Sequence, residues 1–480
     1  MAERFIAALE SHPSPTFPAL DESPCSQSRH EPVSLCLRRL ARALLALVLI
    51  FAPWAFGTTE HWSLIALSAL TGTASILAAA GGWRMGRFNG QWPWAALVLA
   101  LALYMTMQAV NASHRYQLVD QSLISRSHIA WLPHSADSMA TWWTLGKFLT
   151  YAALFWAAAV SFRHDSKWKW LLTVLVINGF LMAMFGIVQN LSGTRELFWI
   201  RPPGYRSDIF GPFVNPNNYS AYMNLLVPVA LAMGRSAQRR AQSHKSHPGY
   251  LFYFMAAVMI VSVVMSKSRA GIVICLLLTA SWLFLCWRIH HGETRGLLVP
   301  VGLLAVTASV ILVWIDTAPI ETKLARLQDV PEELTGSGQR AGAYRGTLAM
   351  FCDRWFLGIG AGTFAAVFPY YQPPDVIGSW QYAHCDWLQY LAELGIVGSG
   401  ILVAVGIAAS RRRQSATPAH EHRSSRSMTR HAVTLALGGL GLHAVVDFPL
   451  HIAGVTTLAV VYFALLSRYP GIVGGAEQTA

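Results

Sequence analysis

Long apolar stretches recur along the chain and are separated by polar segments. A helix needs about 20 mostly apolar residues to cross the hydrocarbon core of a bilayer, and these stretches come close to that length. The pattern therefore predicts an all-α polytopic membrane protein with about 12 transmembrane helices. We place the predicted spans at residues 41–57, 62–82, 93–111, 142–162, 169–191, 217–234, 250–266, 270–288, 296–316, 388–409, 431–446 and 452–468.

One polar segment is much longer than the others. It covers residues 317–387, between the ninth and tenth predicted spans, and it forms one large loop. The predicted organisation is an N-terminal tail at 1–40, a membrane domain of spans 1–9 at 41–316, the large loop at 317–387, a membrane domain of spans 10–12 at 388–468, and a C-terminal tail at 469–480.

Composition supports this architecture. The 480 residues are 54% hydrophobic and 12% charged, against about 25% charged in soluble domains. The formal net charge of +12 gives no reason to expect a nucleic-acid partner, because excess Lys and Arg in such proteins mark cytoplasmic loops. Arg38, Arg39 and Arg42 flank the first span, and every even-numbered loop is basic. The charge pattern therefore predicts both tails in the cytoplasm and the large loop on the outer side.

Several cations break this pattern on the predicted outer side. Lys267 and Arg269 occupy a very short turn between two spans, and Arg206 and Arg340 lie in outer loops. Arginine offers phosphate oxygens a planar fork of donors and keeps its charge at any working pH. These side chains suit a lipid with an anionic phosphate head, and the alternative is that they are snorkelling or solvated loop residues. No Asp-rich metal motif accompanies them, so we expect no metal ion and no other cofactor.

His384 is the candidate general base. An imidazole can accept a proton near neutral pH, and His384 lies where the large loop enters the tenth span. Asp386 or another acid could orient its ring, and the alternative is a structural His at a helix start. Asp447 and His451 lie in the last outer turn, on the same predicted side. They are either part of the site or part of a turn that ends a helix.

Glycine and cysteine in the large loop leave simpler explanations open. Gly358-x-Gly-x-Gly362 has the spacing of a phosphate loop, but no strand-turn-helix unit surrounds it. A tight turn is therefore favoured. Cys352 and Cys385 share the loop and either form a disulfide or remain free thiols.

The middle of the loop predicts one helix. Residues 340–354 are amphipathic at helical spacing, with Tyr344, Leu348, Phe351 and Cys352 on one side. We expect this side to cover a cavity or to lie on the membrane surface.

Four segments resemble motifs of the O-antigen ligase and polymerase superfamily of bacterial envelope glycan enzymes. The last of them is similar to a His-Asn-x-x-Leu-Gln-x-x-x-Glu-x-Gly signature, with Cys385 in place of the Asn. The resemblance covers about residues 200 to 460. The four segments are residues 206–217 (RSDIFGPFVNPN), 266–271 (SKSRAG), 336–364 (GSGQR through GIGAGTF) and 383–395 (AHCDWLQYLAELG).

The resemblance implies a glycosyltransferase at the periplasmic face of the bacterial inner membrane. Its donor would be a glycan on undecaprenyl diphosphate. Its acceptor would be a hydroxyl of the lipid A core or of a growing polysaccharide, in a site bordered by membrane lipid. The essential loop His of the family corresponds to His384, as base in an inverting transfer. The family's arginines correspond to Arg269 and Arg206, which would hold the diphosphate.

The same resemblance implies a substrate-binding set around these residues. Arg340 matches a recurrent loop arginine, and Asn215 and Asn217 would line the cavity. Asp386, directly after the His-Cys pair, completes the predicted set.

Two alternatives to a ligase stay open. Within the superfamily, the motifs equally suit a polysaccharide polymerase or a protein O-oligosaccharyltransferase. Outside it, 12 spans would suit a transporter. Many transporters consist of two related halves, however, and a large loop after span nine breaks that symmetry.

Overall fold

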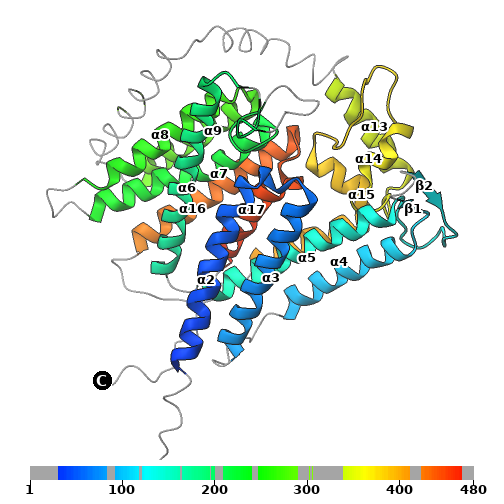
Figure 1. The fold of residues 1–480 in the computed structure, drawn as a ribbon, viewed down its shortest axis with the longest axis horizontal. Coiled ribbons are helices and arrows are strands. Elements are labelled where there is room, and N and C mark those ends of the chain that lie inside the picture. Colours follow the sequence, from blue (N-terminus) through cyan, green and yellow to red (C-terminus); the bar gives the residue numbers. More distant parts are fainter. Residues whose placement is uncertain are drawn as a thin grey trace, which may run out of the picture.

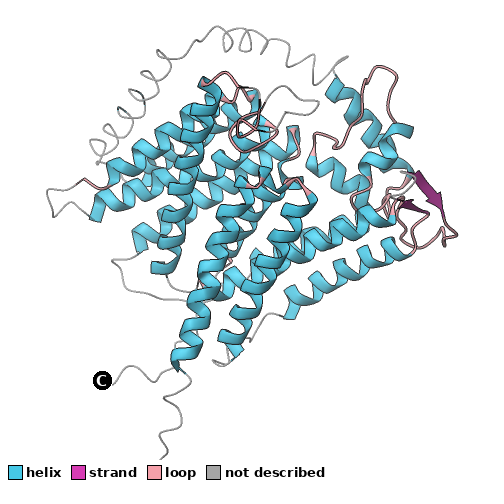
Figure 2. Cartoon of the chain, in the orientation of Figure 1, coloured by secondary structure: helices cyan, strands magenta, loops and turns pink. Residues whose placement is uncertain are grey.

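The computed structural model describes residues 31–83, 92–117, 122–162, 165–194, 196–200, 209–240, 247–289, 302, 305, 339–410 and 423–467. Figures 1 and 2 show a helical protein whose only sheet in the described part is a small hairpin at one edge. The predicted ninth span at 296–316 and the predicted site residue Arg206 lie outside the described residues.

Long helices make up most of the structure. Each predicted span except 296–316 falls on one of them. Five, namely α3, α4, α6, α9 and α15, are long and apolar enough to cross a membrane. The fold is therefore that of an all-α membrane protein, and the count of 12 spans stays a prediction. The helices are α2 (Glu31–Trp54), α3 (His61–Trp83), α4 (Trp92–Val110), α5 (Ser138–Ser161), α6 (Asp165–Leu191), α7 (Pro216–Arg240), α8 (Gly249–Met265), α9 (Arg269–Ile289), α15 (Asp386–Ser410), α16 (Arg423–Val446) and α17 (Ala453–Leu466).

Helix α7 forms the centre of the bundle. It packs against α8, α9 and α16, and nearly all of its side chains from Tyr219 to Ala232 are buried. Peripheral helices instead expose large apolar side chains, such as Ile76, Leu99 and Leu276. Apolar side chains on the outside suit contact with lipid, since hydrocarbon is as good a solvent for them as a protein core.

The described part of the large loop folds over the beginning of α15. It contains α13 (Gln339–Asp353), the short α14 (Phe364–Val367) and the 3-10 turn η3 (Phe368–Tyr370). Its apolar core includes Met350, Phe364 and Phe368. This small core fixes the loop as an ordered cap beside the helices (Figure 1).

The predicted helix at 340–354 is present as α13, and small residues form part of its buried face. Leu348 is 51% exposed, while the small residues Gly342 and Gly346 face the loop. A Cβ atom on Gly342 would overlap Val376, and one on Gly346 would lie 2.7 Å from the carbonyl oxygen of Tyr371. Close backbone approach, rather than the largest apolar side chains, therefore decides which face is buried.

Two shorter elements complete the fold. The strands β1 (His114–Gln117) and β2 (Ser122–Ser125) pair antiparallel in the connection from α4 to α5. The 3-10 turns η1 (Phe56–Thr58) and η5 (Pro449–His451) follow α2 and precede α17.

Candidate active site

The backbone of His384 is held in an uncommon conformation. Its φ angle is 56°, in the left-handed region that non-glycine residues seldom adopt. Two hydrogen bonds fix this segment. The Tyr344 hydroxyl donates to the carbonyl oxygen of His384 at 2.9 Å, and the amide of Ala383 donates to Oε1 of Gln389 at 2.9 Å. Such strain persists only where surrounding contacts over-determine it, and it is common at functional sites.

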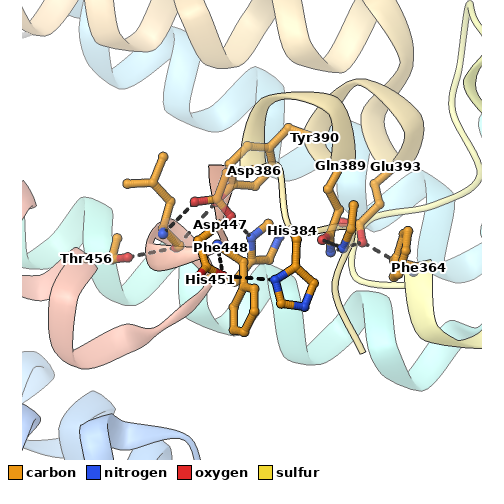
Figure 3. A network of polar contacts seen from close by, with 12 residues as sticks. Phe364, His384, Asp386, Gln389, Tyr390, Glu393, Asp447, Phe448, His451 and Thr456 are labelled. Carbon is orange, nitrogen blue, oxygen red and sulfur yellow. Dashed lines mark hydrogen bonds and ion pairs between the residues drawn. The ribbon is translucent and has the colours of Figure 1, made fainter. Parts of the chain in front are cut away.

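The imidazole of His384 lies against a carboxylate. Its Nδ1 is 3.2 Å from Oδ1 of Asp447, and the side chain is 12% exposed. Trp380 and Phe448 contact the ring edge-to-face at centroid distances of 5.2 and 4.8 Å. Figure 3 shows His384 pointing toward the turn that contains Asp447 and Phe448. The ring is therefore fixed by one charge and two aromatic side chains.

Asp447 is built to stay ionised although only 1% of its side chain is exposed. Its carboxylate accepts hydrogen bonds from the Phe448 amide at 2.9 Å and from Nδ2 of Asn217. Burial alone would raise the pKa of Asp447, but His384 and the charge of Arg340 lower the pKa to about 2. A charged carboxylate therefore lies beside the imidazole of His384.

A second His–Asp pair crosses the first. The Asp386 carboxylate accepts from Nδ1 of His451 and, at 2.7 Å, from the Leu450 amide. The ring of His451 stacks on Tyr390 at 4.7 Å. Each segment thus supplies the acid for the histidine of the other: Asp447 lies beside His384, and Asp386 lies beside His451. The acid beside His384 is Asp447, and Asp386, with no exposed side-chain surface, serves His451 instead.

The glycine-rich segment binds an internal carboxylate. Glu393 accepts hydrogen bonds from the Gly362 amide at 2.7 Å, the Phe364 amide at 3.3 Å and Nε2 of Gln389 at 3.0 Å. Gly358 lies against the kink of α15, where an added Cβ would overlap the carbonyl of Glu393. The segment is a tight turn whose amides bind Glu393, and it links α15 to the segment that precedes His384.

The start of α7 reaches the same site. Asn215 caps the helix, because its Oδ1 accepts from the Asn217 amide at 3.0 Å and Pro216 occupies the first helical position. The Asn217 side chain then donates to Asp447. These asparagines were predicted to line a cavity, and in the structure Asn217 supports the acid beside His384.

The turn with Arg269 is anchored one helical turn further along α7. Gly271 lies so close to Ser220 that any side chain would overlap its hydroxyl. Nδ2 of Asn224 also donates to the carbonyl oxygen of Gly271 at 3.0 Å. The side chain of Arg269, at the first position of α9, is half-buried. The turn therefore contacts the helix whose first residues include Asn217, the donor to Asp447.

Of the predicted residues, the structure brings together His384 and Asn217 through Asp447, with Arg340 close enough to influence the pKa of that carboxyl. Cys352 and Cys385 are free thiols. Among the residues that the structure describes, no group of three or more His, Cys, Asp or Glu side chains could hold a metal ion.

The sequence predicted Asp447 and His451 on the same side as His384 but did not pair them with their partners. The signal was present as a His-x-Asp segment and an Asp-x-x-x-His turn, each with one acid and one base. Tyr344, which holds the His384 carbonyl, carried no comparable signal, because a tyrosine on an amphipathic helix is ordinary.

Apolar helices that carry a fixed His–Asp pair at one end define a membrane protein with a candidate acid–base site. Residues 254–403, from α8 into α15, match the family model described as O-antigen ligase. This match supports the resemblance to the O-antigen ligase superfamily that the motifs predicted. The matched region contains Arg269, Arg340 and His384 and excludes Asp447. A comparison with curated proteins found no match. The match supports an enzyme of the ligase or polymerase type over a transporter.

Proposed function

We propose that the protein transfers a glycan from undecaprenyl diphosphate to an acceptor hydroxyl at the periplasmic face of the bacterial inner membrane. The acceptor is a sugar of the lipid A core or of a growing polysaccharide. The observation that carries this proposal is the imidazole of His384 held 3.2 Å from the buried Asp447 carboxylate. Charge of that kind beside a fixed imidazole is the arrangement of a general base.

The ring nitrogen that faces the carboxylate decides which nitrogen of His384 accepts a proton in the proposed mechanism. Nδ1 of His384 faces Asp447, so the neutral ring carries its proton there and leaves Nε2 as the acceptor. Nε2 takes the proton of the acceptor hydroxyl while that oxygen attacks the anomeric carbon. The bond from this carbon to the diphosphate oxygen breaks on the opposite face, which inverts the configuration. Asp447 then stabilises the imidazolium.

Arginines supply the charge that the leaving group needs. Arg269 begins α9 near the site, and Arg340 influences the pKa of Asp447 from the first turn of α13. Their guanidinium groups match phosphate oxygens in geometry and charge, and a neutralised diphosphate is a better leaving group. Arg206, from the segment before α7, is the third member of this proposed set.

The test is the transfer rate of two His384 variants. His384→Ala removes the base, and His384→Asn also tolerates the positive φ angle. Both should lower the rate by about 10²–10⁴-fold, the usual contribution of a general base. The exposed His61→Ala is the matched control and should transfer at the normal rate. A folded, inserted His384→Asn protein with normal transfer would refute the assignment.

The product separates the ligase from its relatives. In a deletion strain, unattached long glycan chains indicate loss of ligation, and single repeats on the lipid core indicate loss of a polymerase. Loss of glycan from a protein alone indicates a protein O-oligosaccharyltransferase.

A further inference from the structure

The connection between α4 and α5 places two arginines on one face of a hairpin. Arg115 in β1 pairs with Ile124 in β2, and the Arg126 amide donates to the carbonyl oxygen of Ser113 at 2.7 Å. Directly paired residues of antiparallel strands point to the same side, and so do residues two apart. Arg115 and Arg126 are therefore diagonal neighbours on one face.

These arginines form one wall of a cleft. Ser138, Met139 and Trp142, from the first turns of α5, form the other wall. The cleft thus combines two guanidinium groups with an indole and a thioether. Two like charges this close are unfavourable unless an anion lies between them, and a phosphate group would accept from both forks.

No carboxylate of the described residues forms an ion pair with either arginine. Asp137, the residue before α5, uses one carboxylate oxygen as a helix cap. Its Oδ1 accepts from the Met139 amide at 2.9 Å and from the Tyr116 amide at 3.4 Å. Among the described residues, neither arginine of the cleft therefore has a carboxylate partner.

Exposed apolar side chains beside the cleft indicate where an anion for the cleft comes from. Ile124, Ile129 and Trp131 on the same connection are 47%, 49% and 78% exposed. Tryptophan, isoleucine and arginine together on a surface are typical of the layer where lipid headgroups meet acyl chains. Figure 1 shows the hairpin at the ends of α4 and α5.

The two helices continue this surface. Leu99, Leu103 and Val110 on α4 are 59–65% exposed, and Leu149 on α5 is 45% exposed. A lipid whose phosphate lay in the cleft would have apolar helix surface available for its acyl chains.

We propose that this cleft binds the phosphate of a membrane-lipid headgroup, at a site separate from the His–Asp pair. The connection also contacts the glycine-rich turn. The Ala136 amide donates to the Ile359 carbonyl, and the Thr141 hydroxyl donates to the Ala361 carbonyl, both at 2.9 Å. A bound headgroup therefore anchors the segment on which the Glu393 turn rests.

The experiment measures lipid binding by the full-length protein in neutral detergent, with a fluorescent short-chain phosphatidic acid as the probe. The variant is Arg115→Gln/Arg126→Gln. The matched control is Arg39→Gln/Arg288→Gln, which removes two exposed arginines from α2 and α9. We expect the first pair to weaken binding on the order of tenfold and the control pair to change it less than about twofold.

Competition identifies the source of the phosphate. Unlabelled phosphatidic acid should displace the probe at concentrations where inorganic phosphate does not. Equal affinity in the two double variants would overturn the proposal, and so would displacement by inorganic phosphate at the same concentration as the lipid. Either single variant, Arg115→Gln or Arg126→Gln, gives the same reading with a weaker effect if the double variant does not fold.

Discussion

Replacing Asp447 by asparagine removes the charge beside His384 and keeps the shape of the side chain. The carboxylate accepts hydrogen bonds from the Phe448 amide and from Nδ2 of Asn217, and Nδ1 of His384 lies 3.2 Å from it. An amide at this position keeps one accepting oxygen and turns the other atom into a donor. That donor must then face either Nδ2 of Asn217, which also donates, or the His384 ring.

The structure sets the magnitude of the loss. The pKa of Asp447 is lowered to about 2, against about 3.9 for an ordinary aspartate. This difference corresponds to about 2–3 kcal/mol of interaction with the charged form. Truncation of one partner in a buried charge pair costs a similar amount, about 2–5 kcal/mol. If the imidazolium forms during transfer, Asp447→Asn should slow transfer by roughly 30- to 150-fold.

An exchange variant separates charge from hydrogen bonding. Asn217→Asp/Asp447→Asn again pairs one acid with one amide across the same contact, but it moves the charge from position 447, beside His384, to position 217 on α7. Thermal unfolding in detergent should recover toward the wild-type temperature, and transfer per folded protein should stay low. A normal rate in either Asp447→Asn or the exchange variant would refute the reasoning.

Acid denaturation gives an independent check on the same charge. Because the folded pKa of Asp447 is depressed, its stabilisation is present above the unfolded pKa and is lost as pH falls from about 4 to about 2. The wild-type unfolding temperature should fall more over that range than that of Asp447→Asn, and parallel curves would contradict the lowered pKa.

Two further predictions concern the loop. Glu393→Gln replaces a buried carboxylate that accepts three hydrogen bonds. It should therefore reduce the free energy of unfolding by about 2–3 kcal/mol. Thermal melts measure this loss, with Glu196→Gln as the control at an exposed position. The second prediction uses variants that keep a single cysteine, either Cys352 or Cys36, both of which are exposed. An impermeant maleimide added to cells with a permeabilised outer membrane should label Cys352 but not Cys36. Labelling of Cys36 alone would place the site in the cytoplasm and contradict the proposed function.

The helices were predictable because apolar length is a property of local sequence. His384 was predictable as well, since its segment carries a recognisable order of residues. The partner of His384 was not, because Asp386 is two positions away and Asp447 is 63 positions away. Helix α15 begins at Asp386 and directs that carboxylate to His451. Only the packing of α16 and α17 against α15 decides which acid meets which base.

The residues that α13 buries could not be predicted from the sequence for a related reason. Amphipathic spacing ranks faces by hydrophobicity, whereas Gly342 and Gly346 are buried because they permit close backbone contact. The same applies to Gly358 and Gly362, whose spacing suggests a phosphate ligand. In the structure the Gly362 amide donates to the Glu393 carboxylate and the Gly358 amide to the Arg354 carbonyl oxygen. A glycine in the sequence indicates a close contact but does not identify the group that makes it.

The crossed pairs make the site a product of the whole assembly. Each acid serves the histidine of the other segment: Asp447 meets His384, and Asp386 meets His451. Neither segment can therefore be displaced without leaving a buried carboxylate unpaired, which costs several kcal/mol. The large loop supplies the base, but the turn between α16 and α17 supplies its charge partner. An isolated loop would contain His384 without the carboxylate that orients it, so binding and transfer require the loop and the last helices together.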